Sequence, residues 1–252
     1  MKNHFFTYLL IAYFVLTLAG PLALIASDAI DFHSDYRTAN RDSAHLAPHP
    51  KTTKEAVIQV YSARAFNWRG IASVHTWLAI KPKDAHFYTV YQVVGWLLFR
   101  NLSPLYIVND IPDRNWFNQK PILLLDIRGD AAEKIIPKIK KSAMSYPYKK
   151  EYSTWPGPNS NTFIAWIARH VPEMRLSLPS NAVGKDFLNL NQGEWIARAP
   201  SGTGFQLSIY GIVGVLLAID EGIEINLLGL VYGFSLTRIT LKLPGFGDIK
   251  LI

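Results

Sequence analysis

Ser160, His75 and Gln92 are the residues whose types and expected positions suit acyl-transfer chemistry. Ser160 follows Asn159 at the expected start of a helix, where free backbone N–H groups and the helix dipole favour a nucleophile or an anion. His75 lies within an expected strand, where its imidazole could serve as a general base. A polar side chain on the next strand would orient that ring, with Gln92 as the first candidate and His86 as the alternative. The three positions predict a nucleophile, a base and an orienting group.

The helix that would carry Ser160 has a clear start in the sequence. A turn rich in proline and glycine, residues 155–158, leads into Asn159, which is a favourable N-cap residue. Ser160 shares a helical face with the apolar residues that follow, so it is expected to face the core: Phe163, Ile164 and Ile167. The alternative is that Ser160 only helps to cap the helix and that His75 is a hydrogen-bonded core histidine.

Several other kinds of chemistry are excluded or unsupported. The chain has no cysteine, which excludes disulfides, thiolate catalysis and cysteine-ligated metals. No residues have credible metal-site spacing, so we expect no metal and no cofactor. Lys185 and Asp186 follow Gly184 without a phosphate-loop pattern, and the glycines at 202 and 204 lack the context of a dinucleotide site. Nucleic acid is not an expected partner, because no recognised reader accompanies the net charge of +7.

The N-terminal segment, residues 1–27, predicts export. The 22 residues from Phe5 to Ala26 carry no charge, and as a helix they would span about 33 Å, enough to cross a bilayer. Lys2 precedes this stretch and acidic residues follow it, which places the N-terminus in the cytoplasm and the rest outside. We expect a single-pass anchor, with the domain on the periplasmic side of the inner membrane; a cleaved signal, and hence a secreted protein, is the alternative.

Residues 28–53 are expected to form a linker, and residues 54–252 a single domain. Histidines 33, 45 and 49 lie in the linker, where no regular element would set a ligand spacing. Within the domain we expect strands over residues 56–65, 71–80, 88–99, 105–109 and 122–127. A helix is expected over residues 129–146, with Asp130 and Glu133 as a capping box and Pro137 producing a kink or a later start. Its lysines would form a solvated face able to attract anionic lipid.

The last fifty residues have a different pattern. Two apolar, glycine-containing stretches, residues 207–214 and 225–233, resemble each other and are separated by a turn at residues 220–222. We expect a hairpin of two long strands with a third strand over residues 238–243. This hairpin could cover the main sheet or rest against the bilayer. The expected fold class is therefore α+β: an N-terminal apolar helix, an antiparallel sheet with packed helices, and a C-terminal β-hairpin extension.

Two short motifs resemble the circularly permuted papain-like superfamily, which includes NlpC-type peptidases and lecithin:retinol acyltransferase-like enzymes. These motifs are His75-Thr76-Trp77 and residues 159–163, which match a strand histidine beside an aromatic residue and the pattern Asn-Cys-x-x-Phe. Over residues 56–245 the chain also resembles an uncharacterised family of bacterial envelope proteins. The stretches that carry this likeness are residues 75–82, 94–96, 155–163, 184–187 and 200–204. The resemblance implies a papain-like cleft with His75 and Ser160 at its centre.

Ser160 stands where these enzymes have their nucleophilic cysteine, and a serine hydroxyl cannot be ionised in advance as a thiol can. Three functions therefore remain open. The cleft could bind an envelope peptide, acyl chain or lipid without thiol catalysis, as a pseudoenzyme. Alternatively, Ser160 and His75 could form a serine hydrolase or acyltransferase, or the protein could be purely structural. The residues expected to contact a ligand are Trp77, Trp155, Asn159 and Asn161.

Overall fold

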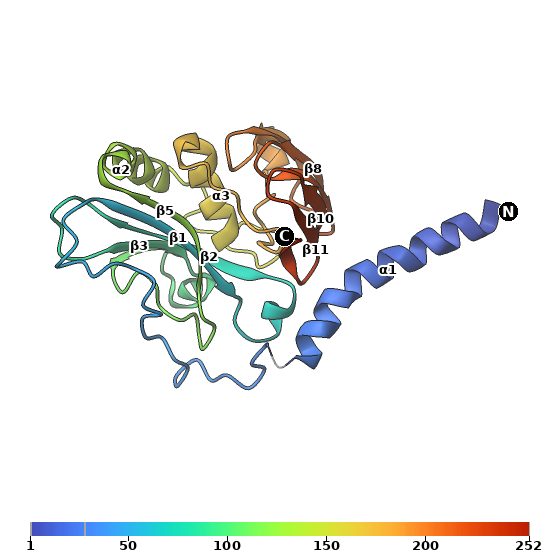
Figure 1. Ribbon diagram of the computed structural model, residues 1–252, viewed down its shortest axis with the longest axis horizontal. Helices are drawn as coiled ribbons and strands as arrows, with labels where there is room; N and C mark the ends of the chain where they lie inside the picture. Colours follow the sequence, from blue (N-terminus) through green and yellow to red (C-terminus); the bar gives the residue numbers. More distant parts are fainter. Residues whose placement is uncertain (1, 28, 252) are drawn as a thin grey trace.

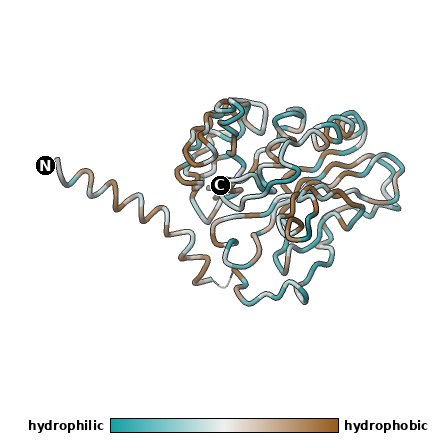
Figure 2. Tube along the Cα trace, turned by 180° about the vertical axis from the view of Figure 1, so that it is seen from behind, coloured by the Kyte–Doolittle hydropathy of each residue, from teal (hydrophilic) through white to brown (hydrophobic). Residues whose placement is uncertain are grey.

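The computed structural model describes residues 2–27 and 29–251 (Figure 1). Its first element is helix α1, Lys2–Ala26, which is long and apolar enough to cross a membrane and exposes most of its side chains. α1 projects away from the body of the protein, and hydrophobic residues recur along it (Figure 2). The prediction of an N-terminal apolar helix is confirmed, while the predicted boundary at residue 28 lies outside the described residues.

The main sheet is antiparallel and has the strand order β4-β3-β2-β1-β5. Its strands are β1 Val57–Arg64, β2 Val74–Lys81, β3 Thr89–Val93, β4 Leu105–Asn109 and β5 Ile122–Arg128. β1 and β2 pair along their whole lengths, whereas β2 and β3 pair only between Leu78–Ile80 and residues 89–91. The first half of β2, which includes His75, therefore has no ladder partner on the β3 side.

Two predicted strands have different bounds in the structure. The strand predicted over residues 71–80 starts at Val74, because residues Asn67–Ile71 form the 3₁₀ helix η1. The strand predicted over residues 88–99 ends at Val93 and is followed by the 3₁₀ helix η2, Gly95–Arg100. Gly95 stands at the start of η2, where the Tyr152 ring occupies the space that a side chain would need.

Two helices pack on one face of this sheet and close the larger core (Figure 1). They are α2 Gly129–Met144 and α3 Ser160–His170. α2 forms where it was predicted, but the capping box of Asp130 and Glu133 is wrong: Arg128 is the N-cap residue and makes no side-chain capping bond. The alternative of a later start is also wrong, since the helix begins at Gly129 and contains Pro137.

The C-terminal region forms a second antiparallel sheet, with strand order β12-β11-β10-β9-β8-β7-β6. Its strands are β6 Ile196–Arg198, β7 Gly204–Ile209, β8 Val213–Ala218, β9 Gly222–Leu227, β10 Leu230–Ser235, β11 Thr240–Leu243 and β12 Gly247–Lys250. Two 3₁₀ helices, η3 Pro172–Met174 and η4 Leu190–Gln192, lie on the path from α3 to β6.

The predicted hairpin of two long strands is wrong, because each apolar stretch is cut by a tight turn into two short strands. Gly211, Gly222 and Gly229 have positive φ values of 70°, 81° and 81°, a backbone region that favours glycine. The turn predicted at residues 220–222 is present between β8 and β9. The α+β class with antiparallel sheets is confirmed.

Residues 29–53 contain no helix or strand among the described residues, yet they are held against the main domain. The Asp113 carboxylate accepts hydrogen bonds from Ser43 Oγ at 2.8 Å and from the backbone N–H groups of Leu46 and Ala47 at 2.6 and 3.1 Å. In the part of the chain that the structure describes, no cluster of histidine and acidic side chains has the arrangement of a metal site.

Candidate functional site

Asn159 builds the turn that presents Ser160 at the start of α3. Its Oδ1 accepts hydrogen bonds from the backbone N–H groups of Asn161 at 2.9 Å and Thr162 at 3.2 Å, and Thr162 Oγ1 accepts from the Asn159 N–H at 3.1 Å. This reciprocal pair is a capping box. Asn159 Nδ2 also donates to the Val183 carbonyl at 3.0 Å. The side chain of Asn159 is therefore already engaged in holding this turn.

Asn161 joins the first turn of α3 to strand β2 on both sides of His75. Its Nδ2 donates to the Val74 carbonyl at 2.9 Å, and its Oδ1 accepts from Thr76 Oγ1 at 2.9 Å. All four residues are buried. Because a buried amide with satisfied bonds resists displacement, Asn161 holds the helix start against the histidine-bearing part of the strand.

The His75 ring is held between aromatic rings and one amide. Its Nε2 lies 3.0 Å from Gln92 Oε1, and its plane stacks on Trp116 with ring centroids 3.7 Å apart and an angle of 9°. Trp77 stacks nearby, at 5.7 Å between centroids. Because an amide oxygen accepts a hydrogen bond, the neutral ring carries its proton on Nε2 and keeps a lone pair on Nδ1.

The electrostatics keep this histidine neutral. Burial lowers the pKa of His75 to about 4, and the Gln92 hydrogen bond opposes that effect only in part. Among the described residues no carboxylate is hydrogen-bonded to the ring. An imidazolium at this position would therefore lack a counter-ion, and the neutral ring is the form present at neutral pH.

His75 and Ser160 line the same cavity, which has a volume of about 340 Å³. Within the described parts of the chain, no hydrogen bond holds the Ser160 Oγ, so it is free to meet a ligand. Much of the remaining wall is apolar or aromatic, and these side chains include Phe66, Val93, Val94, Trp96, Leu98, Phe99, Trp116 and Tyr152. A cavity of this kind suits a ligand with an apolar body and a small polar head.

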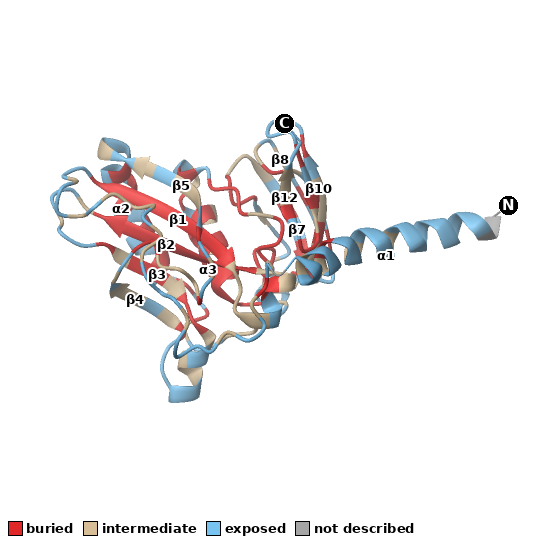
Figure 3. Cartoon of the chain, turned by 60° about the horizontal axis from the view of Figure 1, so that its bottom comes forward, coloured by how far each residue is buried: buried red, intermediate tan, exposed pale blue. Residues whose placement is uncertain are grey.

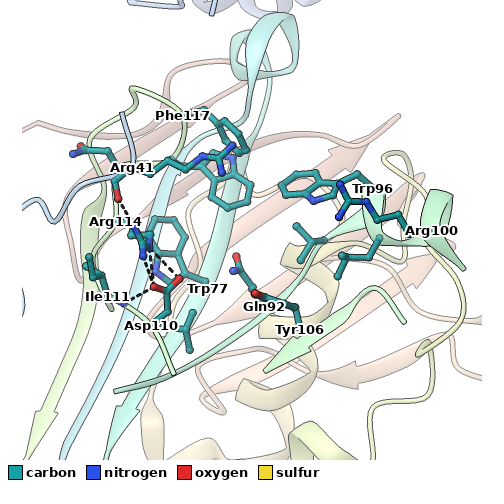
Figure 4. Close-up of a pocket in the computed structure, with 15 residues that line it drawn as sticks. Arg41, Trp77, Gln92, Trp96, Arg100, Tyr106, Asp110, Ile111, Arg114 and Phe117 are labelled. Atoms are coloured by element: carbon teal, nitrogen blue, oxygen red, sulfur yellow. Dashed lines mark hydrogen bonds and ion pairs between the residues drawn. The ribbon is translucent and has the colours of Figure 1, made fainter. Parts of the chain in front are cut away.

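A second cavity of about 430 Å³ adjoins the first, and Trp96 and Trp116 line both. Figure 4 shows Gln92 in its middle, with Asp110 and Arg114 on one side. Arg114 Nε donates to both Asp110 carboxylate oxygens, at 2.9 and 3.0 Å. Gln92, whose amide orients His75, therefore lines the second cavity, whereas His75 itself lines the first.

The structure brings together most of the residues singled out from the sequence. Ser160, His75, Asn159 and Asn161 line the first cavity, and Gln92 and Trp77 line the second. Trp155 lies apart from both, because its Nε1 donates to the Leu228 carbonyl at 2.9 Å in a turn of the second sheet. The alternative orienting group, His86, lines a different cavity beside residues 43–50.

Trp116 is the site residue that sequence reasoning missed. It stacks on His75 and lines both cavities, yet it lies in a loop outside every strand. The available signal was the adjacent pair Trp116 and Phe117, since large aromatic side chains contribute much of the energy of cores and interfaces.

Comparison with known proteins gives one family match. A family model described as "Protein of unknown function (DUF3750)" matches residues 55–187, which is just over half of the chain and covers the main sheet, both packed helices and the cavity-lining residues of α3. No curated protein and no solved structure matches the chain.

Proposed function

We propose that this chain, which belongs to the DUF3750 family, is an anchored bacterial envelope protein that binds a lipid acyl chain without thiol catalysis. The observation that carries the proposal is the make-up of the first cavity: neutral His75 and unbonded Ser160 belong to a lining that is otherwise largely apolar. The hydroxyl and the start of α3 would meet a carboxyl or ester head group, and the aromatic wall would take the hydrocarbon.

A permuted papain-like arrangement is part of this proposal. The strand histidine precedes the helix-start residue in the chain, as in that superfamily, and the Gln92 oxygen faces Nε2 while Nδ1 stays unengaged among the described residues. Ser160 replaces the cysteine expected by that resemblance.

The position of the cavity relative to α1 supports a lipid source for the ligand. Arg69 lines the cavity and belongs to η1, and η1 packs against α1. A lipid leaving a bilayer crossed by α1 would therefore meet the cavity close by. The guanidinium of Arg69 could also attract a phosphate or carboxylate head group.

We also propose that the folded domain lies on the periplasmic side, because Lys2 precedes the apolar stretch and Asp31 and Asp35 follow it. A single cysteine introduced at the exposed residue Met144 should react with an impermeant maleimide in intact spheroplasts. Reaction only after permeabilisation would reverse the orientation.

Two features favour binding over catalysis. A histidine with a pKa of about 4 is a weak proton acceptor, and its charged form would gain no carboxylate partner from the described residues. A serine hydroxyl also needs proton removal during attack, whereas a thiol could ionise beforehand. The site therefore holds a polar head group more readily than it activates Ser160.

A serine hydrolase or acyltransferase is the second candidate, favoured by the open Nδ1 of His75 and the unbonded Oγ of Ser160 in one cavity. Ser160 Oγ would attack an acyl carbonyl while its proton passes to Nδ1, and that proton would then leave with the departing alcohol or amine. Water or an acceptor alcohol would next cleave the acyl-serine ester. Labelling by a fluorophosphonate probe that is lost in Ser160→Ala and retained in Ser145→Ala would establish this candidate.

The test of binding is a titration of the full chain in detergent with a fluorescent fatty acid. We expect saturable binding that weakens at least tenfold in Trp96→Ala, because Trp96 lines the cavity, and is unchanged in Trp195→Ala, whose exposed ring lies outside its lining. His75→Ala should also weaken binding, and it should lower stability as well because it removes a buried ring stacked on Trp116. Absence of saturable binding, or equal loss in both tryptophan variants, would contradict the proposal and favour a structural role.

A further inference from the structure

The second sheet turns its apolar face outward. Along β7, Gln206 and Ser208 are buried while the residues between and beside them are exposed, and the same alternation runs through β8 and β9 (Figure 3). The exposed large apolar side chains from β7 to β11, including the turns between these strands, are Phe205, Leu207, Ile209, Val213, Val215, Leu217, Ile219, Ile223, Ile225, Leu228, Phe234, Leu236, Ile239 and Leu241. We call this surface the outer face.

The opposite side of the sheet is polar and tied to the main domain. Glu224 is ion-paired through its two carboxylate oxygens with Lys185 and Lys242, and all three side chains are buried. Asn226 Nδ2 donates to Asp186 Oδ2 at 2.9 Å, and Gln206 Nε2 donates to Asp186 Oδ1 at 3.0 Å. Because these charges cannot be turned to water without breaking the network, the apolar face must point outward.

An exposed apolar surface as large as the outer face is unusual for a soluble monomer. The largest apolar patch on a typical soluble monomer covers about 300–600 Å² and often serves an interaction. Here the exposed apolar side chains extend from β7 to β11, across most of a seven-stranded sheet. Apart from the contacts of α1 with β10 and β11, the described residues of the chain leave the outer face uncovered.

The contacts of helix α1 indicate what covers the outer face. Thr17 is hydrogen-bonded to the Tyr232 hydroxyl of β10, and the Tyr13 and Tyr232 rings lie 5.9 Å apart. These contacts fall near the middle of the apolar span, His4–Ala26. Gly20 allows the close approach, since a Cβ there would lie 2.1 Å from the Pro244 carbonyl oxygen. If α1 crosses a bilayer, the strand packed against its middle cannot remain outside the lipid.

The position of the second sheet relative to α1 agrees with contact between this sheet and lipid. The second sheet forms the side of the body toward which α1 projects (Figures 1 and 3). The residues from Lys2 to Tyr13 extend about 18 Å beyond the contact with β10, roughly the depth of one leaflet with its head groups.

We propose that the outer face of the β6–β12 sheet lies against the lipid of the membrane leaflet nearer the folded domain. The protein would then contact the membrane through both a helix and a sheet face. This rests on the proposed role of α1 as an anchor. Apolar side chains on the outer face would exchange water for acyl chains, and the buried polar side would keep its bonds to the main domain.

The absence of cysteine makes a direct test possible. Single-cysteine variants Leu217→Cys and Ile225→Cys on the outer face, and Met144→Cys at the exposed end of α2, are spin-labelled and the full chain is reconstituted in phosphatidylcholine–phosphatidylglycerol vesicles. We expect a several-fold higher ratio of oxygen to nickel-chelate relaxation at positions 217 and 225 than at position 144. That pattern would place the two labels in hydrocarbon.

Two other results would overturn the inference. Labels at 217 and 225 that meet the nickel chelate as readily as the label at 144 would show the outer face in water. Spin–spin broadening between labels on separate chains, with protection from both reagents, would show that a second copy covers the face. In either case, flotation of the protein with the vesicles would still support the anchor, whereas failure to float would refute the anchor itself.

Discussion

The two sheets of this protein differ in which of their side chains are buried. In the main sheet, β1 and β2 are buried on both faces, and the end of β2 that carries His75 meets the start of α3. In the second sheet the polar face is buried and the apolar face is exposed. The comparison teaches that a period of two defines the faces of a strand but not which face is inside.

The buried polar face of the second sheet depends most strongly on its network of ion pairs. Replacing Glu224 with glutamine would leave Lys185 and Lys242 buried without their shared carboxylate. We expect Glu224→Gln to lower the free energy of unfolding by about 3–5 kcal/mol in urea denaturation. Glu173→Gln breaks an exposed pair with Lys138 and should cost at most about 1 kcal/mol. Equal effects of the two variants would show that the network does not hold the sheet's orientation.

The end of the main sheet that carries His75 should be sensitive to acid. Folding lowers the pKa of His75 from 6.5 to about 4 by burial, so the unfolded chain binds more protons between these values. Stability is therefore fully present above pH 6.5 and is lost as the pH falls toward 4, by roughly 3 kcal/mol at about 1.4 kcal/mol per pH unit.

Urea denaturation between pH 4 and 7.5 measures this slope. His75→Gln should flatten it, while His86→Gln, at a site away from the cavity, should retain it. A slope unchanged by His75→Gln would mean that the ring is not held neutral by burial.

The hydrogen bonds of Asn161 connect the start of α3 to the part of β2 that carries His75. Asn161→Ala removes the hydrogen bonds to the Val74 carbonyl and Thr76 Oγ1 and should cost about 1–3 kcal/mol. It should also weaken fatty-acid binding, since Ser160 would lose its fixed position. Asn191→Ala, at a largely exposed position in η4, is the control. Full binding by Asn161→Ala would separate the helix start from ligand recognition.

The smallest expected effect is on reactivity at position 160. In Ser160→Cys, neutral His75 supplies no positive charge, so the rate of thiol alkylation should rise with a midpoint at or above about pH 8.5. Ser145→Cys provides a matched thiol outside the cavity. A midpoint far below that of the control would reveal a thiolate–imidazolium pair and would favour the catalytic candidate.

Local signals predicted much of the main domain. Asn159 and the apolar spacing after it located α3, and short apolar runs located β1, β4 and β5, because caps and periodicity depend on near neighbours in the chain. The end of β3 was not predicted, because the apolar run continues past Val93 and no local pattern records the contact of Gly95 with the distant Tyr152 ring.

The candidate site was predicted in part for the same reason. His75 and Ser160 stood out by type and position, and the structure places both on one cavity. Trp116 contributes through stacking across a loop that no local pattern describes. The inward polar face of the second sheet depends on Lys185, which pairs with Glu224 across 39 residues, so alternation alone could not assign it.

The most direct test of the central claim is a crystal structure of the full chain with a long-chain fatty acid. The account predicts hydrocarbon density along Phe66 and Trp96, a carboxylate at the start of α3, and an unmodified Ser160 Oγ. An acyl ester on Ser160 Oγ after incubation with an activated acyl donor would contradict binding without catalysis. An empty cavity at saturating ligand would contradict lipid binding itself.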